Sequence, residues 1–168
     1  MDVRAEQERA NLLESLIQLL NEHKVKYSVT GGQAVNAYAE PVVTLDLDLA
    51  IAIEEIPQVE QWLGERFHVK RFPHSVNVSL PDSNLRVQAQ TDPRYSDFVK
   101  HATTREILGV SLPVAGLENV LQGKIWAATD PESRSSKRQE DLADIAGLIE
   151  NYPELREKVP AEILARLI

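Results

Sequence analysis

The chain has 168 residues, of which 43% are hydrophobic and 26% are charged, and these proportions are typical of one folded globular domain. The formal net charge of -8 excludes a general basic surface for nucleic acid, because the only compact basic cluster is Arg134-Ser-Ser-Lys137-Arg138. The absence of cysteine excludes disulfides, thiolate catalysis and Cys-ligated zinc.

The sequence has no feature that directs it to a membrane. It begins Met-Asp-Val-Arg-Ala-Glu, which is charged and lacks the apolar core of a signal peptide. No apolar run approaches the roughly 18 residues that a membrane-spanning helix needs. We therefore expect a cytoplasmic protein with no membrane partner.

The first half of the chain alternates helices and strands. Leucines that recur on one face predict a helix over about 5–23. A short strand over 27–30 ends in a glycine pair, and a short helix over 33–39 stops before Pro41. An alternating strand over 45–53 follows, and Pro57 starts a helix that runs to about residue 67.

The second half continues with strands and ends in helices. Three strands are predicted over 68–72, 75–80 and 85–90, a helix over 92–101 and an extended segment over 106–114. Helices are predicted over 116–128, over 135–151 and from Pro160 to the end. This order predicts an α/β (α+β) fold in one domain over 1–168, with a small mixed sheet backed by helices over about 1–114 and a packed helical part over about 115–168.

Two aspartates carry the first chemical signal, in Thr44-Leu-Asp46-Leu-Asp48-Leu. Side chains alternate along a strand, so Asp46 and Asp48 share one face, and Leu45, Leu47, Leu49, Ile51 and Ile53 take the other. Two carboxylates on one face can hold the same hard cation. A strand with one solvent-facing side also accommodates such a pair without any function.

The glycine pair Gly31-Gly32 precedes this strand, at the start of the predicted short helix. Glycines there allow a backbone to approach a phosphate closely. The combination resembles the nucleotidyltransferase superfamily, whose signature is Gly-Gly or Gly-Ser, a helix, and then a strand with Asp-x-Asp. The resemblance implies a nucleotidyltransferase-like sheet and a bound nucleoside triphosphate.

Residue by residue, the resemblance makes Asp46 and Asp48 the catalytic ligands of Mg²⁺ or Mn²⁺. Gly31 and Gly32 match the turn that faces the triphosphate. Gln33 stands where many relatives have a phosphate-binding serine, and its amide can still donate a hydrogen bond. The family often adds a third carboxylate from a later strand, and the matching position here is Gln88, a neutral amide that cannot act as a general base. Asp92 lies a few residues further along.

A second partial match lies in the C-terminal third, where AbiEii-like toxins carry a helix with a lysine and then a helix with Asp-x-x-Asp. Here these residues are Lys124 and Asp141-Leu-Ala-Asp144. The resemblance implies that Lys124 contacts the triphosphate. Asp141 lies one turn before Ile145 on the core side of its helix, where it is placed to orient this lysine, and Asp144 is a supporting candidate. We expect Lys124 to contribute to nucleotide affinity rather than to folding. Lys137 and Asp141 are also an ordinary i,i+4 pair of an exposed helix.

Two functions follow from the resemblance. The first is a metal-dependent enzyme that transfers a nucleoside monophosphate from a nucleoside triphosphate to RNA, a protein or a small molecule, of the toxin–antitoxin kind if a cognate partner protein exists. The second is a catalytically lapsed relative that binds a nucleotide or a protein for regulation. Gln88 favours the second, and the presence of both Asp46 and Asp48 favours the first.

Overall fold

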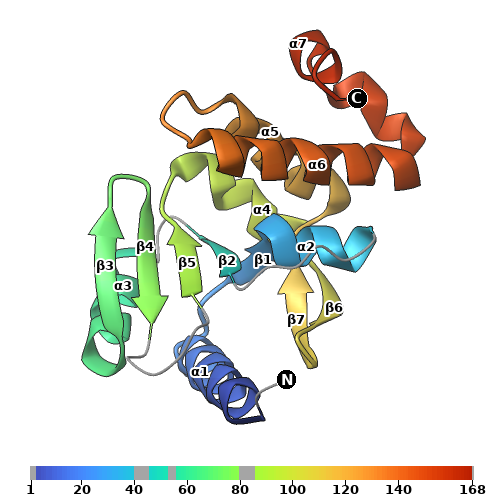
Figure 1. The fold of residues 1–168 in the computed structure, drawn as a ribbon. Coiled ribbons are helices and arrows are strands. Elements are labelled where there is room, and N and C mark those ends of the chain that lie inside the picture. Colours follow the sequence, from blue (N-terminus) through green and yellow to red (C-terminus); the bar gives the residue numbers. More distant parts are fainter. Residues whose placement is uncertain (1–2, 40–45, 53–55, 80–85, 168) are drawn as a thin grey trace.

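The structure is a computed structural model that describes residues 3–39, 46–52, 56–79 and 86–167, with side chains from residue 13 onward. Figure 1 shows the arrangement of its elements. In chain order they are α1 (Val3–Glu22), β1 (Tyr27–Thr30), α2 (Gly31–Tyr38), β2 (Asp46–Ile51), α3 (Ile56–Arg66), β3 (His68–Phe72), β4 (Ser75–Ser79), β5 (Arg86–Gln90), the 3₁₀ turn η2 (Pro93–Ser96), α4 (Asp97–Lys100), β6 (Thr103–Ile107), β7 (Val110–Val114), α5 (Leu117–Thr129), α6 (Ser135–Asn151), the 3₁₀ turn η3 (Pro153–Lys158) and α7 (Ala161–Leu164).

The described strands form one mixed seven-stranded sheet in the order β3-β4-β5-β2-β1-β7-β6. At its centre β2 runs antiparallel to β1 and parallel to β5. The hairpins β3–β4 and β6–β7 extend the two edges. The Asp-x-Asp strand is therefore central, with β1 and the start of α2 on one side and β5 on the other.

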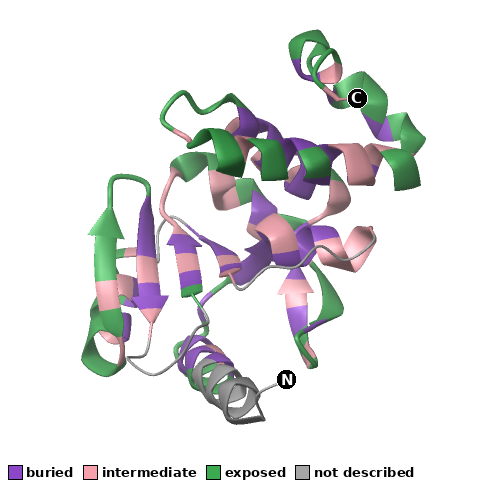
Figure 2. Ribbon diagram, viewed as in Figure 1, coloured by how far each residue is buried: buried purple, intermediate pink, exposed green. Residues whose placement is uncertain are grey.

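Helices cover the sheet and share the core with its strands. Leu16 and Leu20 of α1 are buried together with Leu47 and Leu49 of β2. In Figure 1 the α5–α6 pair lies across one end of the sheet and α1 lies at the other. Burial is concentrated on the central strands and on the inward faces of α5 and α6, as Figure 2 shows. None of the described helices is long and apolar enough to span a membrane.

The predicted α/β fold class is confirmed, and so is the alternation of the Asp-x-Asp strand, whose leucines are buried. Several boundaries differ. The predicted helix over 92–101 is a 3₁₀ turn followed by the short α4, and η3 was not predicted. The predicted strand ends at residues 45, 53, 80 and 85 lie outside the described residues.

The extended segment predicted over 106–114 is wrong in form, because the chain makes a β-hairpin from β6 and β7 there. Leu108 and Gly109 both have positive φ, 51° and 82°, as a tight two-residue hairpin turn requires. Leucine rarely adopts this conformation, so the pair Leu-Gly did not indicate a turn.

Candidate active site

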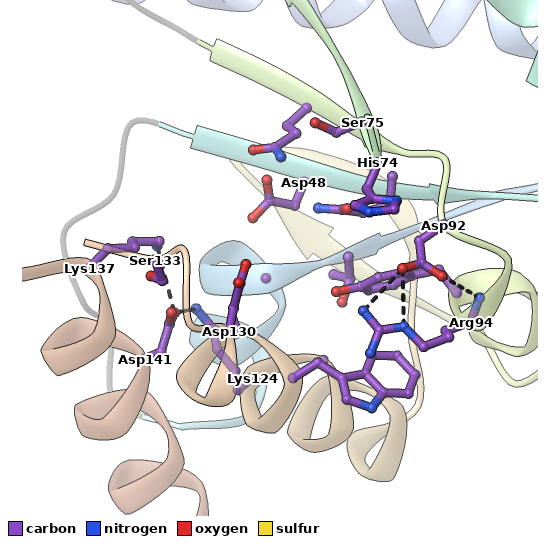
Figure 3. Close-up of a pocket in the computed structure, with 18 of the residues that line it drawn as sticks. Asp48, His74, Ser75, Asp92, Arg94, Lys124, Asp130, Ser133, Lys137 and Asp141 are labelled. Atoms are coloured by element: carbon purple, nitrogen blue, oxygen red, sulfur yellow. Dashed lines mark hydrogen bonds and ion pairs between the residues drawn. The ribbon is translucent and has the colours of Figure 1, made fainter. Parts of the chain in front are cut away.

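A cleft of about 910 Å³ lies between the central strands and the α5–α6 pair. Figure 3 shows its side chains, which come from the ends of the strands on one side and from α5 and α6 on the other. Five residues predicted for the site line this cleft, namely Gly31, Asp48, Gln88, Lys124 and Asp141. Residues that lie up to 110 positions apart in the sequence thus share one cavity.

The glycine pair meets the aspartate strand at Gly31. Thr30 is paired with Asp48 across β1 and β2, and α2 starts immediately after it. Gly31 has a φ of +67°, and a Cβ built on it would lie 2.0 Å from Oδ2 of Asp48. The Asp48 carboxylate therefore occupies the space that any side chain at residue 31 would fill.

Asp48 is the more enclosed of the two aspartates. Burial raises the pKa of its carboxyl to about 6, although the positive charges of Lys124 and Lys137 act in the opposite direction. A nearby cation would relieve this cost of desolvation. Asp46 lies on the same face of β2 but does not line the cleft, and its Oδ1 accepts a 3.0 Å bond from Nε of the largely exposed Arg86.

Gln88 lies opposite Asp48 in the parallel pairing of β2 with β5. Paired residues on neighbouring strands project from the same face of the sheet, so the Gln88 amide stands beside the Asp48 carboxylate. On the other side of β5, Gln88 is paired with Asn77 of β4. The row Asp48, Gln88, Asn77 therefore crosses three strands and faces the cleft.

Lys124 is buried in α5, with 5% of its surface exposed, and is held by two carboxylates of α6. Its Nζ lies 3.0 Å from Oδ1 of Asp141 and 2.8 Å from Oδ2 of Asp144. Desolvation would lower the pKa of Lys124, but the charges of Asp144 and Asp141 hold it above its usual value. The lysine is therefore a fixed ammonium at the cleft wall.

Each of the two carboxylates that hold Lys124 keeps one oxygen that makes no hydrogen bond among the described residues. Oδ2 of Asp141 and Oδ1 of Asp144 are buried and have no hydrogen-bond partner within the described part of the chain. Lys137 approaches Oδ1 of Asp141 at 3.7 Å from the exposed side of α6. The i,i+4 pair of Lys137 and Asp141 is thus attached to a buried network.

Residues that the sequence did not single out complete the far end of the cleft. The guanidinium of Arg94 lies 4.5 Å from the ring centroid of Trp126 and bonds to Asp92 at 3.0 Å. Burial raises the pKa of Tyr95, which also lines the cleft, to about 12, so its hydroxyl stays neutral. In the sequence, Arg94 and Tyr95 were marked only by their position after β5, and Trp126 only by its position within α5.

Asp92 is occupied. Its Oδ1 accepts the backbone N–H of Arg94 at 3.0 Å, and its Oδ2 accepts a bond from the Arg94 side chain. Burial would raise the pKa of Asp92, but these bonds and the charge of Arg94 hold it below its usual value. Asp92 therefore caps η2 rather than replacing the missing third carboxylate.

Three other predicted residues do not reach the cleft. The side chain of Gln33 is 5% exposed and is buried beside Ala34 and Val35, because the short α2 turns that face into the core. Gly32 lies in the same first turn, and Asp144 lies behind Lys124. Gly31 is therefore the member of the Gly-Gly-Gln run that borders the cavity.

The donor set suits a hard divalent cation. Asp46 and Asp48 supply carboxylate oxygens from one strand face, and Gln88 supplies an amide oxygen next to Asp48. No group of three or more His, Cys, Asp or Glu side chains with metal-site geometry occurs among the described residues. Mg²⁺ is commonly held by one or two carboxylates together with substrate phosphates and water, so two aspartates suffice.

Solved structures share the architecture of this chain. The antibiotic-resistance factor ANT(2")-Ia, solved with adenylyl-2"-tobramycin, superposes with a TM-score of 0.62 over 95% of this chain and 99% of its own, at 16% identity. The fold is the nucleotidyltransferase fold. A nucleotidyltransferase-like protein from Paracoccidioides brasiliensis matches with a TM-score of 0.56 at 22% identity, over 96% of this chain and 87% of its own.

The lincosamide antibiotic adenylyltransferase LnuA, solved with lincomycin, has the nucleotidyltransferase fold too, with a TM-score of 0.52 at 13% identity over 81% of this chain and 95% of its own. The sequence matches no protein-family profile, and no curated protein is significantly similar to it. At these identities the likeness establishes the architecture.

Proposed function

We propose that this protein is a metal-dependent nucleotidyltransferase that moves a nucleoside monophosphate from a nucleoside triphosphate to an acceptor. The observation that carries the proposal is the meeting of Gly31, Asp48 and Lys124 at one cleft. A backbone without a side chain, a carboxylate and a fixed ammonium are the groups that a metal-bound triphosphate requires. The solved adenylyltransferases of the same fold support this chemistry.

Each residue has a defined task. Asp46 and Asp48 hold Mg²⁺ or Mn²⁺, and the exposed Arg86–Asp46 pair costs little to rearrange when the cation binds. The cation, when bound, stabilises the negative charge that develops on the transferred phosphoryl group. The backbone of Gly31 borders the phosphates. Lys124 neutralises them and is held in position by Asp141 and Asp144.

Three classes of acceptor fit this proposal: RNA, a protein hydroxyl and a small molecule. A toxin–antitoxin role with a cognate partner protein is a narrower form of it, which rests on the resemblance of Lys124 and Asp141-x-x-Asp144 to AbiEii-like toxins. The experiment is to incubate the protein with each labelled nucleoside triphosphate, Mg²⁺ or Mn²⁺, and a cell extract. Stable label on RNA, protein or a small molecule is expected, and its absence with every nucleotide contradicts enzymatic transfer.

The second candidate is a lapsed enzyme that binds nucleotide for regulation. Gln88 favours it, because the position beside Asp48 carries no carboxylate and Asp92 is engaged by Arg94. Such a protein would bind a nucleoside triphosphate with metal and release it unchanged. Equilibrium binding of labelled nucleotide, measured in parallel with transfer, separates this outcome from the first.

A further inference from the structure

One wall of the cleft is built from neutral hydrogen-bonding side chains. Ser75 and Asn77 of β4 are paired with Gln90 and Gln88 of β5, and all four line the cavity. Because paired residues share a face, these hydroxyl and amide groups form a continuous patch beside Asp48. We call these four residues the amide wall.

Negative charges next to the amide wall are already engaged. Asp92 follows β5 directly, and both of its oxygens accept hydrogen bonds from Arg94. Asp48 belongs to the proposed metal site. The amide wall therefore presents neutral amide and hydroxyl groups, and no charged group, to a bound ligand.

The amide wall also contains an unsatisfied group. Oδ1 of Asn77 is buried and has no hydrogen-bond partner among the described residues. A buried carbonyl oxygen without a partner is unfavourable, so rotation of the Asn77 amide toward a hydrogen-bond donor in the cleft would be favoured. The wall thus lacks a donor that a hydroxyl group can supply.

We propose that the acceptor is a small neutral polyhydroxylated molecule of the sugar or cyclitol class, bound on the amide wall. Amides and hydroxyls both donate and accept, so they match a ring of hydroxyl groups, whereas an ammonium group finds no unpaired carboxylate there. The partly exposed ring of Phe72, which also lines the cleft, adds an apolar surface for the C–H face of such a ring. This inference rests on the proposed nucleotidyl transfer.

The chemical step balances without a further reactant. A hydroxyl oxygen of the acceptor bonds to the α-phosphorus of the triphosphate, and the bond from that phosphorus to the leaving pyrophosphate oxygen breaks. The hydroxyl proton passes to solvent water, because Gln88 cannot take it. The products are a phosphodiester of the acceptor and pyrophosphate.

A cationic acceptor is the competing possibility, because the opposite wall carries Asp130 and Glu132. Ligand-observed NMR on the full chain distinguishes the two. The probes are methyl α-glucopyranoside, myo-inositol and tobramycin, each tested with and without α,β-methylene ATP and Mg²⁺. We expect at least one of the two polyols to bind at lower concentration than tobramycin, and the ATP analogue to strengthen that binding.

Asn77→Asp is the informative variant, because it keeps Oδ1 and the side-chain size but replaces the amide donor with a charge. We expect it to weaken polyol binding at least tenfold and to strengthen tobramycin binding. Gln61→Glu is the matched control, since this exposed residue of α3 adds a charge outside the cleft, and it should leave both unchanged. If Asn77→Asp does not fold, Gln90→Glu places a negative charge on the same wall and should have the same two effects.

The outcomes separate the two proposals. If the ATP analogue fails to bind with Mg²⁺, the proposed nucleotidyl transfer is wrong. If the analogue binds but tobramycin binds better than both polyols, or neither polyol binds, the inferred acceptor class is overturned and the proposed transfer stands. Unchanged selectivity in both wall variants also overturns it.

Discussion

Gly31 and Asp48 lie so close that a Cβ at residue 31 would come within 2.0 Å of Oδ2 of Asp48. Gly31→Ala would force the carboxylate away or move the start of α2, and the φ of +67° adds strain of about 1–2 kcal/mol for any L-residue. We expect Gly31→Ala to lower the free energy of unfolding by more than this amount and to weaken metal binding. Urea unfolding and metal titration measure the two effects.

Gly64→Ala is the matched control for that variant. Gly64 lies inside α3, and a Cβ there would contact nothing within 4 Å. Alanine is favoured over glycine in a helix interior by about 1 kcal/mol, so this variant should be slightly more stable than the wild type. Equal effects of the two substitutions would contradict a special role for Gly31.

Asp46 and Asp48 are predicted to bind one divalent cation together. Binding to the folded state alone raises the melting temperature, so Mg²⁺ or Mn²⁺ should raise it for the wild type. The double variant Asp46→Asn, Asp48→Asn should abolish this rise in thermal unfolding monitored by circular dichroism. A rise of the same size in the double variant would locate the cation elsewhere.

The raised pKa of Asp48 predicts a pH dependence of stability in the metal-free protein. Its carboxyl has a pKa of about 6 in the folded state against an ordinary value of 3.8. Between these values the folded state binds more protons than the unfolded state, so the free energy of unfolding falls as pH rises through this window. Asp48→Asn should remove this contribution when urea unfolding is followed from pH 4 to pH 7. An identical pH profile for the variant would contradict it.

Lys124 is predicted to serve both folding and nucleotide binding. Lys124→Ala leaves Asp141 and Asp144 buried without their ammonium, and breaking a buried pair in this way costs about 3–5 kcal/mol. Loss of a charge-assisted phosphate contact, worth about 1.5–3 kcal/mol, should also weaken nucleotide binding tenfold or more. The expectation from the sequence that folding would be unaffected is therefore revised.

Combining Lys124→Ala with Asp144→Asn separates the two roles. Removal of one buried charge should restore part of the stability, while nucleotide affinity stays low because the ammonium is still missing. Calorimetric titration with α,β-methylene ATP and Mg²⁺ measures the affinity. Recovery of affinity together with stability would mean that Lys124 acts through folding alone.

Gln88→Asp is predicted to accelerate any nucleotidyl transfer. It puts a carboxylate next to Asp48, where it can take the acceptor proton, and general-base assistance contributes about 10²–10⁴ in rate. Label transfer to the acceptor measures the effect, and Gln61→Asp on the exposed face of α3 controls for added charge. If the variant folds and binds metal and nucleotide but transfers no faster, residue 88 is not the position of the missing base.

The local patterns in the sequence were enough for the fold class and for the central strand. Alternation of aspartate with leucine predicts a strand with one buried face, and Leu47 and Leu49 are indeed buried. The glycine pair before a short helix is similarly local, because positive φ at Gly31 is a property of the backbone itself. The alternation of side chains along a strand and the backbone preference of glycine depend on a few neighbouring residues, so both can be predicted from the sequence.

Tertiary structure decided which residues share the cleft. Pairing of β2 with β5 aligns Gln88 with Asp48, and packing of α5 on α6 encloses Lys124 between two carboxylates. Pairing of β4 with β5 likewise brings Asn77 into the cleft, and the buried face of α2 takes Gln33 away from it. Strand register and helix packing depend on contacts between residues far apart in the chain, and the pattern within any single segment does not specify them.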